Sequence, residues 1–350
     1  MRARKSPAVF WRASFPLAAI ADTHYNICDK EVRDTKDTVG RFAPTPSGLM
    51  HLGNITCFFL AWISAKNKGG RIILRNEDLD AQRCSPKWAE RAERDLQWLG
   101  LTFDEGGSLG GPSAPYFQSG RSELYLAALE KLKATGLVYP CFCTRSELHA
   151  ASAPHMSDGI TLYAGTCRNL TPEQVSVRIA ETGRQPAMRL RVPDERISFT
   201  DGNMGKITID LARECGDFLL RRSDGVFAYQ LAVVVDDAAM GVTEVVRGAD
   251  LLSSTPWQIY LYRLLGLKAP EFYHIPIVLG ANGKKLSKRD GSDGIDALKA
   301  VYSPEEVVGK LAYLIGQNPA AKPMTAAETA RRFSWHDVPR SGIVIPEGLF

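Results

Sequence analysis

Two short segments that lie far apart in the chain carry residues suited to binding a nucleotide. The first runs from Arg41 to Asn54, where a Pro/Ser/Gly turn separates a predicted strand from a predicted helix. His51 and Gly53 then lie at the helix N-terminus, whose unpaired N–H groups and partial positive charge suit a polyphosphate. His51 could donate a hydrogen bond to a phosphate oxygen, and Gly53 has no Cβ to hold a nucleotide away. A proline-rich turn beside an incidental histidine would look the same, so the interpretation depends on the second segment.

The second segment is the basic run Lys284–Arg289, which follows a stretch too rich in Gly and Asn to form a regular element. A basic run is usually a solvated face or a nucleic-acid patch. This one is short and hinged by glycines, and it follows a predicted strand over Tyr273–Leu279. Ligands of α/β sheets bind outside the carboxyl ends of the strands. We therefore expect both segments to meet at one crevice, an arrangement that favours activation of a substrate by ATP.

The two segments resemble the signatures of the class I aminoacyl-tRNA synthetases. The HIGH signature of that family matches Pro46–Ile55, and its KMSKS signature matches Lys285–Arg289. Within the class, the chain is similar to the glutamyl branch over Arg41–Pro44, Arg75–Asp80 and Val246–Leu251. It most resembles the shortened paralogues of glutamyl-tRNA synthetase that act on queuosine in tRNA(Asp), and the similarity spans residues 39 to 345. A chance match would not reproduce several spaced motifs in the same order along the chain.

The resemblance implies a two-step reaction. L-Glutamate attacks the α-phosphate of ATP, with Mg²⁺ neutralising the phosphates, and the glutamyl-adenylate passes its acyl group to a hydroxyl of queuosine in the anticodon of tRNA(Asp). The catalytic residues implied by the family are His51, Lys285 and Lys288. The implied ATP-binding residues are His51, Gly53, Asn54, Lys285, Ser287 and Lys288. No enzyme nucleophile is needed, because positioning and charge stabilisation supply the catalysis.

Charge arguments give a candidate glutamate pocket. The substrate has two carboxylates and one ammonium, and the guanidinium groups of Arg41 and Arg247 can bind carboxylates bidentately. Glu77 could hold the ammonium, and Tyr229 could add a hydroxyl. Taken singly, such residues are usually surface ion pairs or core aromatics. The resemblance assigns glutamate binding to these four and to Ala43, Thr45 and Ser47. Asn76 departs from the apolar residue usual in the family, and this departure would shift the neighbouring strand contacts.

A cysteine cluster offers three soft metal ligands, Cys141, Cys143 and Cys167. Zinc favours four tetrahedral ligands, and the fourth could be Tyr163, His149 or His155. Cysteines are also commonly small buried hydrophobes, so the spacing alone leaves the site open. The similar glutamyl-queuosine enzymes carry a Cys-x-Cys and Tyr-x-x-x-Cys arrangement, which favours Tyr163. We expect one structural zinc ion per chain.

The elements that must position these residues alternate as in a parallel sheet. The expected elements are a strand over Val39–Phe42, a helix over Asn54–Lys66, a strand over Arg71–Arg75, and helices over Pro86–Leu99 and Ser119–Thr135. The alternation breaks over Tyr139–Leu220 and returns at Val226–Val235 and Val242–Arg247. The sequence therefore predicts an α/β fold with an insertion, and the resemblance implies a Rossmann-type synthetase catalytic domain with an inserted, zinc-containing acceptor-type domain.

Five parts follow from this interpretation. Residues 1–38 form an extension, 39–138 the first catalytic half, 139–220 the inserted domain, 221–290 the second catalytic half, and 291–350 a short helical module of the stem-contact type. Within the last part, Ser303–Glu306 and Thr325–Glu328 are capping boxes that predict two helix starts, and the first helix should end at Gly316. So short a C-terminal part favours the shortened paralogue over a full synthetase with its own anticodon-binding region.

Composition agrees with an enzyme that is not embedded in a membrane. The chain has 350 residues, 45% of them hydrophobic, and no apolar run near the length that spans a bilayer. The net charge of +4 permits a nucleic-acid partner without requiring one. Seven scattered cysteines favour a reducing compartment over a disulfide framework, so we expect a cytoplasmic protein, and a monomer.

The first 38 residues lie outside the resemblance and are basic at their start. Because their apolar patch is short and interrupted by Pro16, we favour a disordered extension or an upstream start codon over a targeting peptide. Three rival functions remain open at this point. They are a truncated glutamyl-tRNA synthetase that charges a 3′ adenosine, a noncatalytic tRNA-binding relic, and a nucleotidyltransferase with another acceptor.

Overall fold

The structure is a computed structural model that describes residues 37–144, 146–147, 162–280, 283 and 294–350. Its contacts group residues 35–350 into one compact unit. The predictions for the basic run Lys284–Arg289, for His149 and His155, and for nearly all of the extension over 1–38 fall outside the described residues.

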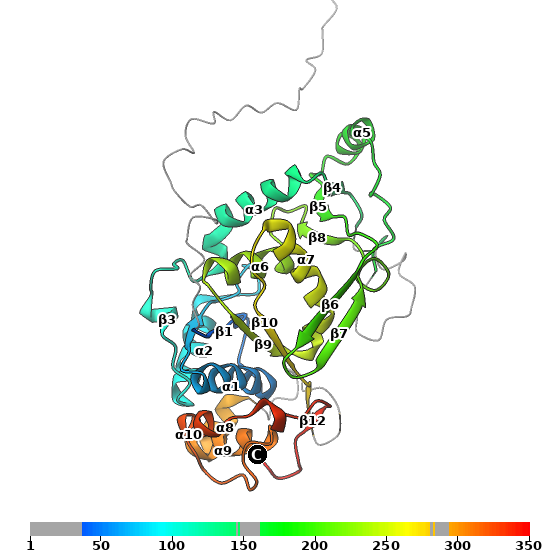
Figure 1. Ribbon diagram of the computed structural model, residues 1–350. Coiled ribbons are helices and arrows are strands. Elements are labelled where there is room, and N and C mark those ends of the chain that lie inside the picture. Colours follow the sequence, from blue (N-terminus) through cyan, green and yellow to red (C-terminus); the bar gives the residue numbers. More distant parts are fainter. Residues whose placement is uncertain (1–36, 145, 148–161, 281–282, 284–293) are drawn as a thin grey trace, which may run out of the picture. The chain divides into compact units, whose positions relative to one another are not determined.

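Two small parallel sheets adjoin at the first strand (Figure 1). One has the order β1 (Val39–Phe42), β2 (Arg71–Leu74) and β3 (Glu105–Gly106), with Val39 opposite Arg71. The other pairs β9 (Glu244–Gly248) with β10 (Glu271–Ile275). Thr243, just before β9, donates its backbone N–H to Val39 O at 2.9 Å and accepts from Val39 N at 2.8 Å. β1 therefore lies between β2 and β9, the kind of switch point at which α/β sheets bind ligands.

Alternate residues of the strands feed two cores on opposite faces of this sheet. Ile72 and Leu74 join the core that holds α1 (Leu52–Asn67) and α2 (Pro86–Trp98). Ile73, between them, joins the core of α3 (Ser122–Ala134), α6 (Tyr229–Ala239) and α7 (Thr255–Leu265). The predicted strand over Val39–Phe42 is confirmed, and the predicted helices agree with α1, α2 and α3 to within a few residues at their ends.

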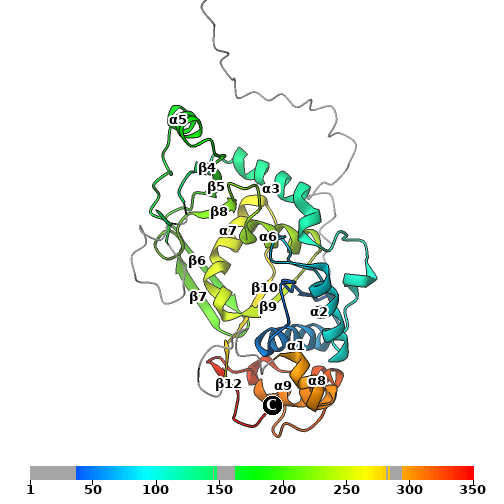
Figure 2. The same ribbon diagram turned by 180° about the vertical axis from the view of Figure 1, so that it is seen from behind.

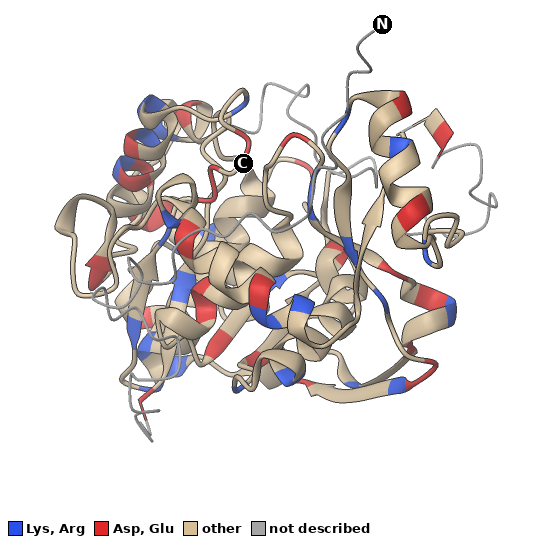
Figure 3. Cartoon of the chain, turned by 90° about the horizontal axis from the view of Figure 1, so that it is seen from above, with Lys and Arg blue, Asp and Glu red and all other residues tan. Residues whose placement is uncertain are grey.

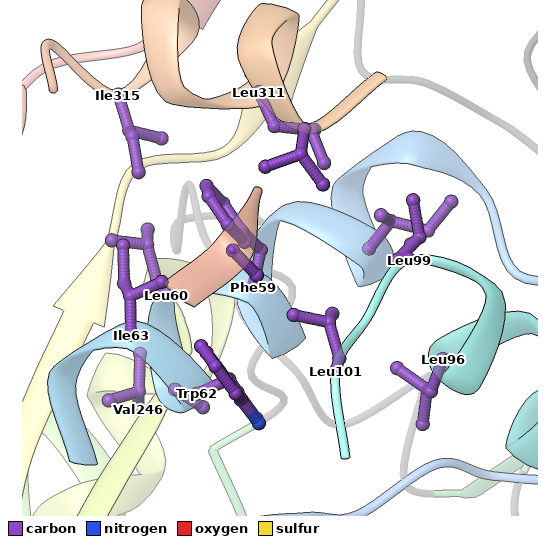
Figure 4. Packing of buried hydrophobic residues seen from close by; sticks show 14 of the residues in the cluster. Phe59, Leu60, Trp62, Ile63, Leu96, Leu99, Leu101, Val246, Leu311 and Ile315 are labelled. Carbon is purple, nitrogen blue, oxygen red and sulfur yellow. The ribbon is translucent and has the colours of Figure 1, made fainter. Parts of the chain in front are cut away.

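The C-terminal helices complete the first core. α8 (Ile295–Val301), α9 (Pro304–Leu314) and α10 (Ala326–Arg332) are grouped beside α1 in both ribbon views (Figures 1 and 2). Leu311 and Ile315 approach Phe59 of α1, as Figure 4 shows. Both predicted capping boxes are present, at the starts of α9 and α10. α9 ends at Leu314, and the chain turns away at Gly316, whose φ is +77°. A Cβ there would lie 2.3 Å from Asp337 O, so glycine is required.

The segment after α3 replaces parallel pairing with antiparallel pairing, as the break in alternation predicted. β4 (Val138–Cys141), β5 (Ala187–Leu190) and β8 (Phe218–Arg221) form one antiparallel sheet. A hairpin of β6 (Arg196–Asp201) and β7 (Gly205–Asp210) lies between β5 and β8 in the chain, and α5 (Pro172–Thr182) lies between β4 and β5. The turn of this hairpin contacts β10, where Gly202 N donates to Phe272 O.

The predicted strand over Tyr273–Leu279 is wrong in one respect, because it divides at Pro276. β10 ends at Ile275, and a separate β11 (Val278–Leu279) pairs in parallel with β12 (Ile343–Val344). Proline has no N–H to give to a ladder, so the chain changes partners there.

Short helical turns complete the described elements. These are Gly107–Leu109, Gln118–Arg121, Leu211–Cys215, Ala249–Ser254 and Trp335–Asp337. Basic and acidic positions are interspersed along the helices and strands of the view in Figure 3, in keeping with the mild net charge. Among the described residues, no helix is both long enough and apolar enough to cross a membrane.

Candidate active site and metal centre

A cavity of about 270 Å³ opens where β1 and β9 adjoin, beside the start of α1. Eight residues singled out from the sequence line it: Arg41, Ala43, His51, Gly53, Asn54, Glu77, Tyr229 and Arg247. Thr45 and Ser47 do not line it; they lie on the loop before α1, Thr45 exposed and Ser47 half-buried. The structure thus brings Arg41 and the start of α1 together with Tyr229 and Arg247, which are distant in sequence.

The N-terminus of α1 is closed by a capping box. His51 is the N-cap residue, and its Nδ1 accepts a hydrogen bond from Asn54 N at 3.3 Å, while Asn54 Oδ1 accepts from His51 N at 3.4 Å. Because Nδ1 is an acceptor, the neutral imidazole carries its proton on Nε2. His51 therefore caps the helix with one ring nitrogen and has a donor on the other, which suits a phosphate oxygen.

Gly53 is constrained by the same histidine. A Cβ at position 53 would lie 3.1 Å from two ring atoms of His51, closer than a side chain normally packs. Glycine therefore lets the His51 ring lie against the first turn of α1. The sequence interpretation gave Gly53 a role toward the nucleotide, and the structure adds this local role.

One wall of the cavity is a buried network of acids and arginines. Arg75 is fully buried and donates to Asp237 Oδ1 at 2.6 Å and to Glu77 Oε1 at 3.2 Å. The Nε of Arg41 lies 3.5 Å from the same Asp237 oxygen, and its Nη1 donates to Val246 O at 3.1 Å. Burial raises the pKa of Glu77, although Arg75 and Arg41 oppose that rise. Arg75 and Asp237 thus hold Arg41 and Glu77 at the cavity.

The cavity is also lined by a guanidinium whose direct partners are neutral. Arg247 is 5% exposed. It donates from Nη1 to Gln258 Oε1 at 2.8 Å, from Nη2 to Thr255 Oγ1 at 2.8 Å, and from Nε to His274 Nε2 at 3.0 Å. Nη1 also lies 3.5 Å from Tyr229 Oη. Burial lowers the pKa of Arg247, because the charged form loses its hydration. Among the described residues no carboxylate forms a salt bridge with it, so its positive charge favours an anionic ligand.

Asn76 follows β2 and is 2% exposed. Its backbone N donates to Tyr116 O at 2.8 Å, and its backbone O accepts from Gln118 N at 3.1 Å. These bonds continue the pairing beyond β2 toward Glu77, whose N donates to Pro44 O at 2.9 Å. The backbone at position 76 is therefore paired directly before the acid of the pocket, whereas the buried Oδ1 of the Asn76 side chain has no hydrogen-bond partner among the described residues.

Several lining residues were missed by the sequence reasoning. Cys57 and Phe58 line the cavity, and they follow Gly53 and Asn54 by one helical turn, the spacing that places residues on one face. This spacing of four residues could have predicted that Cys57 and Phe58 face the same cavity as Gly53 and Asn54. Ile277 and Val278 line the cavity from the segment after Pro276, which the single predicted strand had obscured.

The described chain on either side of residues 284–293 is connected to this cavity in two ways. Val278 lines it on one side of that stretch. On the other side, Gly294 pairs with His51 in an isolated antiparallel bridge. The described residues that flank the basic signature are therefore next to the helix that carries the first signature.

A second cluster lies at the end of β4. The sulfur atoms of Cys141, Cys143 and Cys167 all lie within 4.8 Å of one another. Tyr163 Oη is 3.5 Å from Cys141 Sγ and 3.7 Å from Cys143 Sγ, and the sulfurs of Cys143 and Cys167 are 3.7 Å apart. Ligands about 2.0 to 2.3 Å from a tetrahedral centre lie roughly 3.3 to 3.8 Å from each other, so these separations fit a zinc site.

Two further groups support the anionic forms that such ligands need. Arg189 Nε lies 3.3 Å from Cys141 Sγ, and its guanidinium carbon is 3.9 Å from the centre of the Tyr163 ring. Cys167 N donates to Tyr163 Oη at 2.8 Å. The competing ligands His149 and His155 lie outside the described residues.

Comparison with known proteins identifies the family to which this fold belongs. Residues 37–342 match the family described as tRNA synthetases class I (E and Q), catalytic domain. The chain is 51% identical over 311 residues to the glutamyl-Q tRNA(Asp) synthetase of Symbiobacterium thermophilum, which covers 88% of this chain and 95% of that protein. It is 40% identical over 306 residues to the glutamate–tRNA ligase of a Sulfurihydrogenibium species, covering 86% of this chain and 63% of the ligase.

The fold also matches a solved structure. The crystal structure of a glutamate tRNA ligase from Elizabethkingia meningosepticum in complex with its amino acid superposes with a TM-score of 0.77 at 31% identity, over 90% of this chain and 68% of that one.

Proposed function

The chain belongs to the class I tRNA synthetases for glutamate and glutamine. From that membership and from its similarity to proteins named glutamyl-Q tRNA(Asp) synthetase, we propose that it activates L-glutamate with ATP and transfers the glutamyl group to queuosine in the anticodon of tRNA(Asp). The observation that carries the proposal is the electrostatics of the cavity. Arg247 is buried among neutral hydrogen-bond partners, Arg41 lies at the end of β1, and Glu77 is held between them and Arg75.

This set of charges complements glutamate. The two guanidinium groups match its two carboxylates, and Glu77 matches the ammonium. Arg247 favours the side-chain carboxylate over an amide, because an amide would leave a buried positive charge without a counter-ion. Tyr229 adds a hydroxyl on the same wall as Arg247. We assign glutamate binding to Arg41, Ala43, Thr45, Ser47, Glu77, Tyr229 and Arg247, with Thr45 and Ser47 contributing from the loop before α1.

Activation is an in-line displacement that needs no covalent enzyme intermediate. A substrate carboxylate oxygen attacks the α-phosphorus of ATP, the bond to pyrophosphate breaks, and a mixed anhydride forms. His51, Gly53 and Asn54 present the N-terminus of α1 to the phosphates. Magnesium bound with ATP neutralises phosphate charge. Lys285, Ser287 and Lys288 are assigned to the phosphates on sequence similarity. Val278, before them, lines the cavity, and Gly294, after them, pairs with His51.

The acceptor follows from similarity rather than from the cavity. Identity is 51% to a relative named for glutamyl-Q tRNA(Asp) and 40% to one named for glutamate–tRNA ligation. A hydroxyl of the cyclopentene ring of queuosine would attack the anhydride carbonyl, releasing AMP. His51 and Glu77 are both retained at the cavity, which speaks against a noncatalytic relic.

A structural zinc ion in the cysteine cluster completes the proposal. Cys141, Cys143, Cys167 and Tyr163 would hold it, since the three sulfur atoms lie within 4.8 Å of one another and Tyr163 Oη lies 3.5 Å from Cys141 Sγ and 3.7 Å from Cys143 Sγ. When bound, the ion would tie β4 to the segment that leads into α5. Arg189 would offset the negative charge of the ligand set. Because the substrates are ATP and tRNA, we place the enzyme in the cytoplasm, where it would act as a monomer.

Transfer of labelled glutamate tests this function. The chain is incubated with ATP, magnesium, labelled glutamate and one of three tRNAs: tRNA(Asp) with queuosine, tRNA(Asp) without it, and tRNA(Glu). We expect label only in the first. Label on tRNA(Glu) would instead identify a short glutamyl-tRNA synthetase, and no label on any of them, with no adenylate formed, would identify a noncatalytic protein.

A further inference from the structure

The turn of the inserted hairpin reaches the back of the glutamate cavity. Asp201, the last residue of β6, is 1% exposed, and its carboxylate accepts from the backbone N of Asn203 at 3.0 Å and of Met204 at 2.8 Å. It also accepts from His274 N on β10 at 3.1 Å. Gly202 N donates to Phe272 O at 2.8 Å. The turn is therefore bound to β10 at several points.

Glycine at position 202 makes this close approach possible. A Cβ there would lie 1.9 Å from a ring atom of Tyr273, so any other residue would force the turn away from the strand. Asn203 Nδ2 donates to His274 O at 3.0 Å, on the far side of the same residue. The hairpin thus holds both the backbone and the side chain of His274.

The His274 ring connects the hairpin to Arg247. His274 is fully buried, and its Nδ1 lies 2.6 Å from Asp201 Oδ2. Arginine can only donate, so the 3.0 Å contact from Arg247 Nε makes His274 Nε2 an acceptor. The proton of the neutral ring is therefore on Nδ1, where it is donated to Asp201. Resting on the proposed role of Arg247 in binding glutamate, we propose that Asp201 and His274 are positioning residues that fix Arg247, so that the hairpin turn forms part of the glutamate site.

The electrostatics of the ring agree with this assignment. The charged groups around it are Asp201 from β6, Arg247 from β9 and Arg41 from β1. Burial lowers the pKa of His274, and Asp201 opposes that effect. A neutral ring can accept from Arg247, whereas a protonated ring would place a second positive charge against the guanidinium. A carboxylate in direct contact with Arg247 would neutralise it; the interposed imidazole orients Arg247 and leaves its charge for the substrate.

Two substitutions of His274 separate positioning from general structure. In His274→Gln the side-chain amide reaches the place of Nε2 and can still accept from Arg247. In His274→Asn the amide is at the place of Nδ1, so the contact with Asp201 is kept and that with Arg247 is lost. We expect His274→Asn to raise the glutamate KM about tenfold or more, as for one lost hydrogen bond to a charged group, and His274→Gln to raise it much less. The ATP KM should change in neither.

The test measures ATP–pyrophosphate exchange with tRNA present, and thermal unfolding of each variant, with Arg247→Lys included. Equal glutamate KM values for the two His274 variants, with Arg247→Lys impaired, would overturn the positioning role and leave the proposed function standing. An unchanged glutamate KM in Arg247→Lys would overturn the assignment of Arg247 itself. Asp201→Asn serves as a second probe, because an altered hairpin contact should also raise the glutamate KM without changing the ATP KM.

Discussion

A buried guanidinium without an acidic partner is costly unless a ligand supplies the counter-charge. Arg247 is bound by Gln258, Thr255 and His274, all neutral, whereas Arg41 shares Asp237 with Arg75. The two arginines of the pocket therefore differ. Arg41 lies near a carboxylate in the free protein and Arg247 does not, so we propose that selection of a carboxylate over an amide depends on Arg247.

Arg247→Gln should therefore weaken glutamate binding and reduce the preference for glutamate over glutamine. We expect a loss of about 2 to 4 kcal/mol in glutamate kcat/KM, since a charged hydrogen bond and the charge itself are removed. Exchange assays with each amino acid measure this. Arg263→Gln is the matched control, because Arg263 pairs with Glu195 on the surface and away from the cavity. An unchanged preference in Arg247→Gln would show that this arginine does not select the substrate.

Lys288→Ala should abolish adenylate formation while leaving glutamate binding intact. Removing a group that stabilises transition-state charge typically costs about a hundredfold or more in kcat. Pyrophosphate exchange reports the first effect, and protection of the protein by glutamate against thermal unfolding reports the second. Lys322→Ala, at an exposed lysine, should behave as the parent. Normal exchange in Lys288→Ala would remove this lysine from the catalytic set.

At the scale of elements, the N-terminus of α1 combines a capping box with the proposed nucleotide site. Gly53→Ala should leave thermal stability unchanged or slightly raised, because alanine is the better helix former. It should nevertheless raise the ATP KM, because the new Cβ would lie 3.1 Å from the His51 ring and displace it. Steady-state kinetics and thermal melting together check both parts. A variant with the parental ATP KM would mean that the position of the His51 ring is unimportant.

The cysteine cluster predicts a link between metal content and stability in the inserted segment. Cys167→Ser should lower both the zinc stoichiometry, measured by atomic absorption, and the unfolding temperature. Cys215→Ser is the control, since Cys215 is also buried but lies apart from the cluster. Tyr163→Phe keeps the ring beside Arg189 and removes only the oxygen. Parental zinc content in Cys167→Ser would exclude the proposed ligand set.

Some elements were predictable from sequence because their signals are local. The strand over Val39–Phe42, the helix after His51 and the two C-terminal capping boxes depend on neighbouring residues and occur as predicted. The partners of Arg247 were not predictable. Thr255 and Gln258 lie on α7, and His274 lies on β10 with Asp201 behind it, so only the three-dimensional fold brings them together. The hairpin turn at Gly202 was missed for the same reason.

Across the whole molecule, buried ionisable groups connect the pocket to global stability. Burial lowers the pKa of His274, so the unfolded chain binds a proton at a higher pH than the native state does. The stability from the neutral ring is therefore complete above the unfolded pKa, about 6.5, and is lost as the pH falls below it. The pKa of Asp201 is lowered despite its burial, because His274 and backbone N–H groups donate hydrogen bonds to its carboxylate. Protonation of Asp201 in stronger acid therefore causes a further loss of stability.

His274→Gln should remove the first of these losses. Urea unfolding at pH 7.5 and pH 5.5 measures the free energy of unfolding in each protein. We expect the parent to lose more stability between the two values than the variant loses, because glutamine does not titrate. Equal losses would show that His274 is not buried as a neutral group.

The C-terminal helices also act at this scale, because they share a core with α1. Leu311 and Ile315 pack near Phe59 on the helix that carries His51 and Gly53. The part of the chain that the sequence predicts as a short helical module of the stem-contact type also supports α1 in the structure. Its stability and that of the cavity are therefore connected.

The central claim is that the glutamyl group ends on a modified base in the anticodon, and locating the label tests it most directly. Queuosine-containing tRNA(Asp) is labelled with glutamate by the enzyme and digested by a base-specific ribonuclease at mildly acidic pH, which preserves the ester. The fragments are then separated and counted. We predict that the label is on the anticodon fragment. Label on the 3′-terminal adenosine would contradict the account and make this enzyme a conventional, though short, glutamyl-tRNA synthetase.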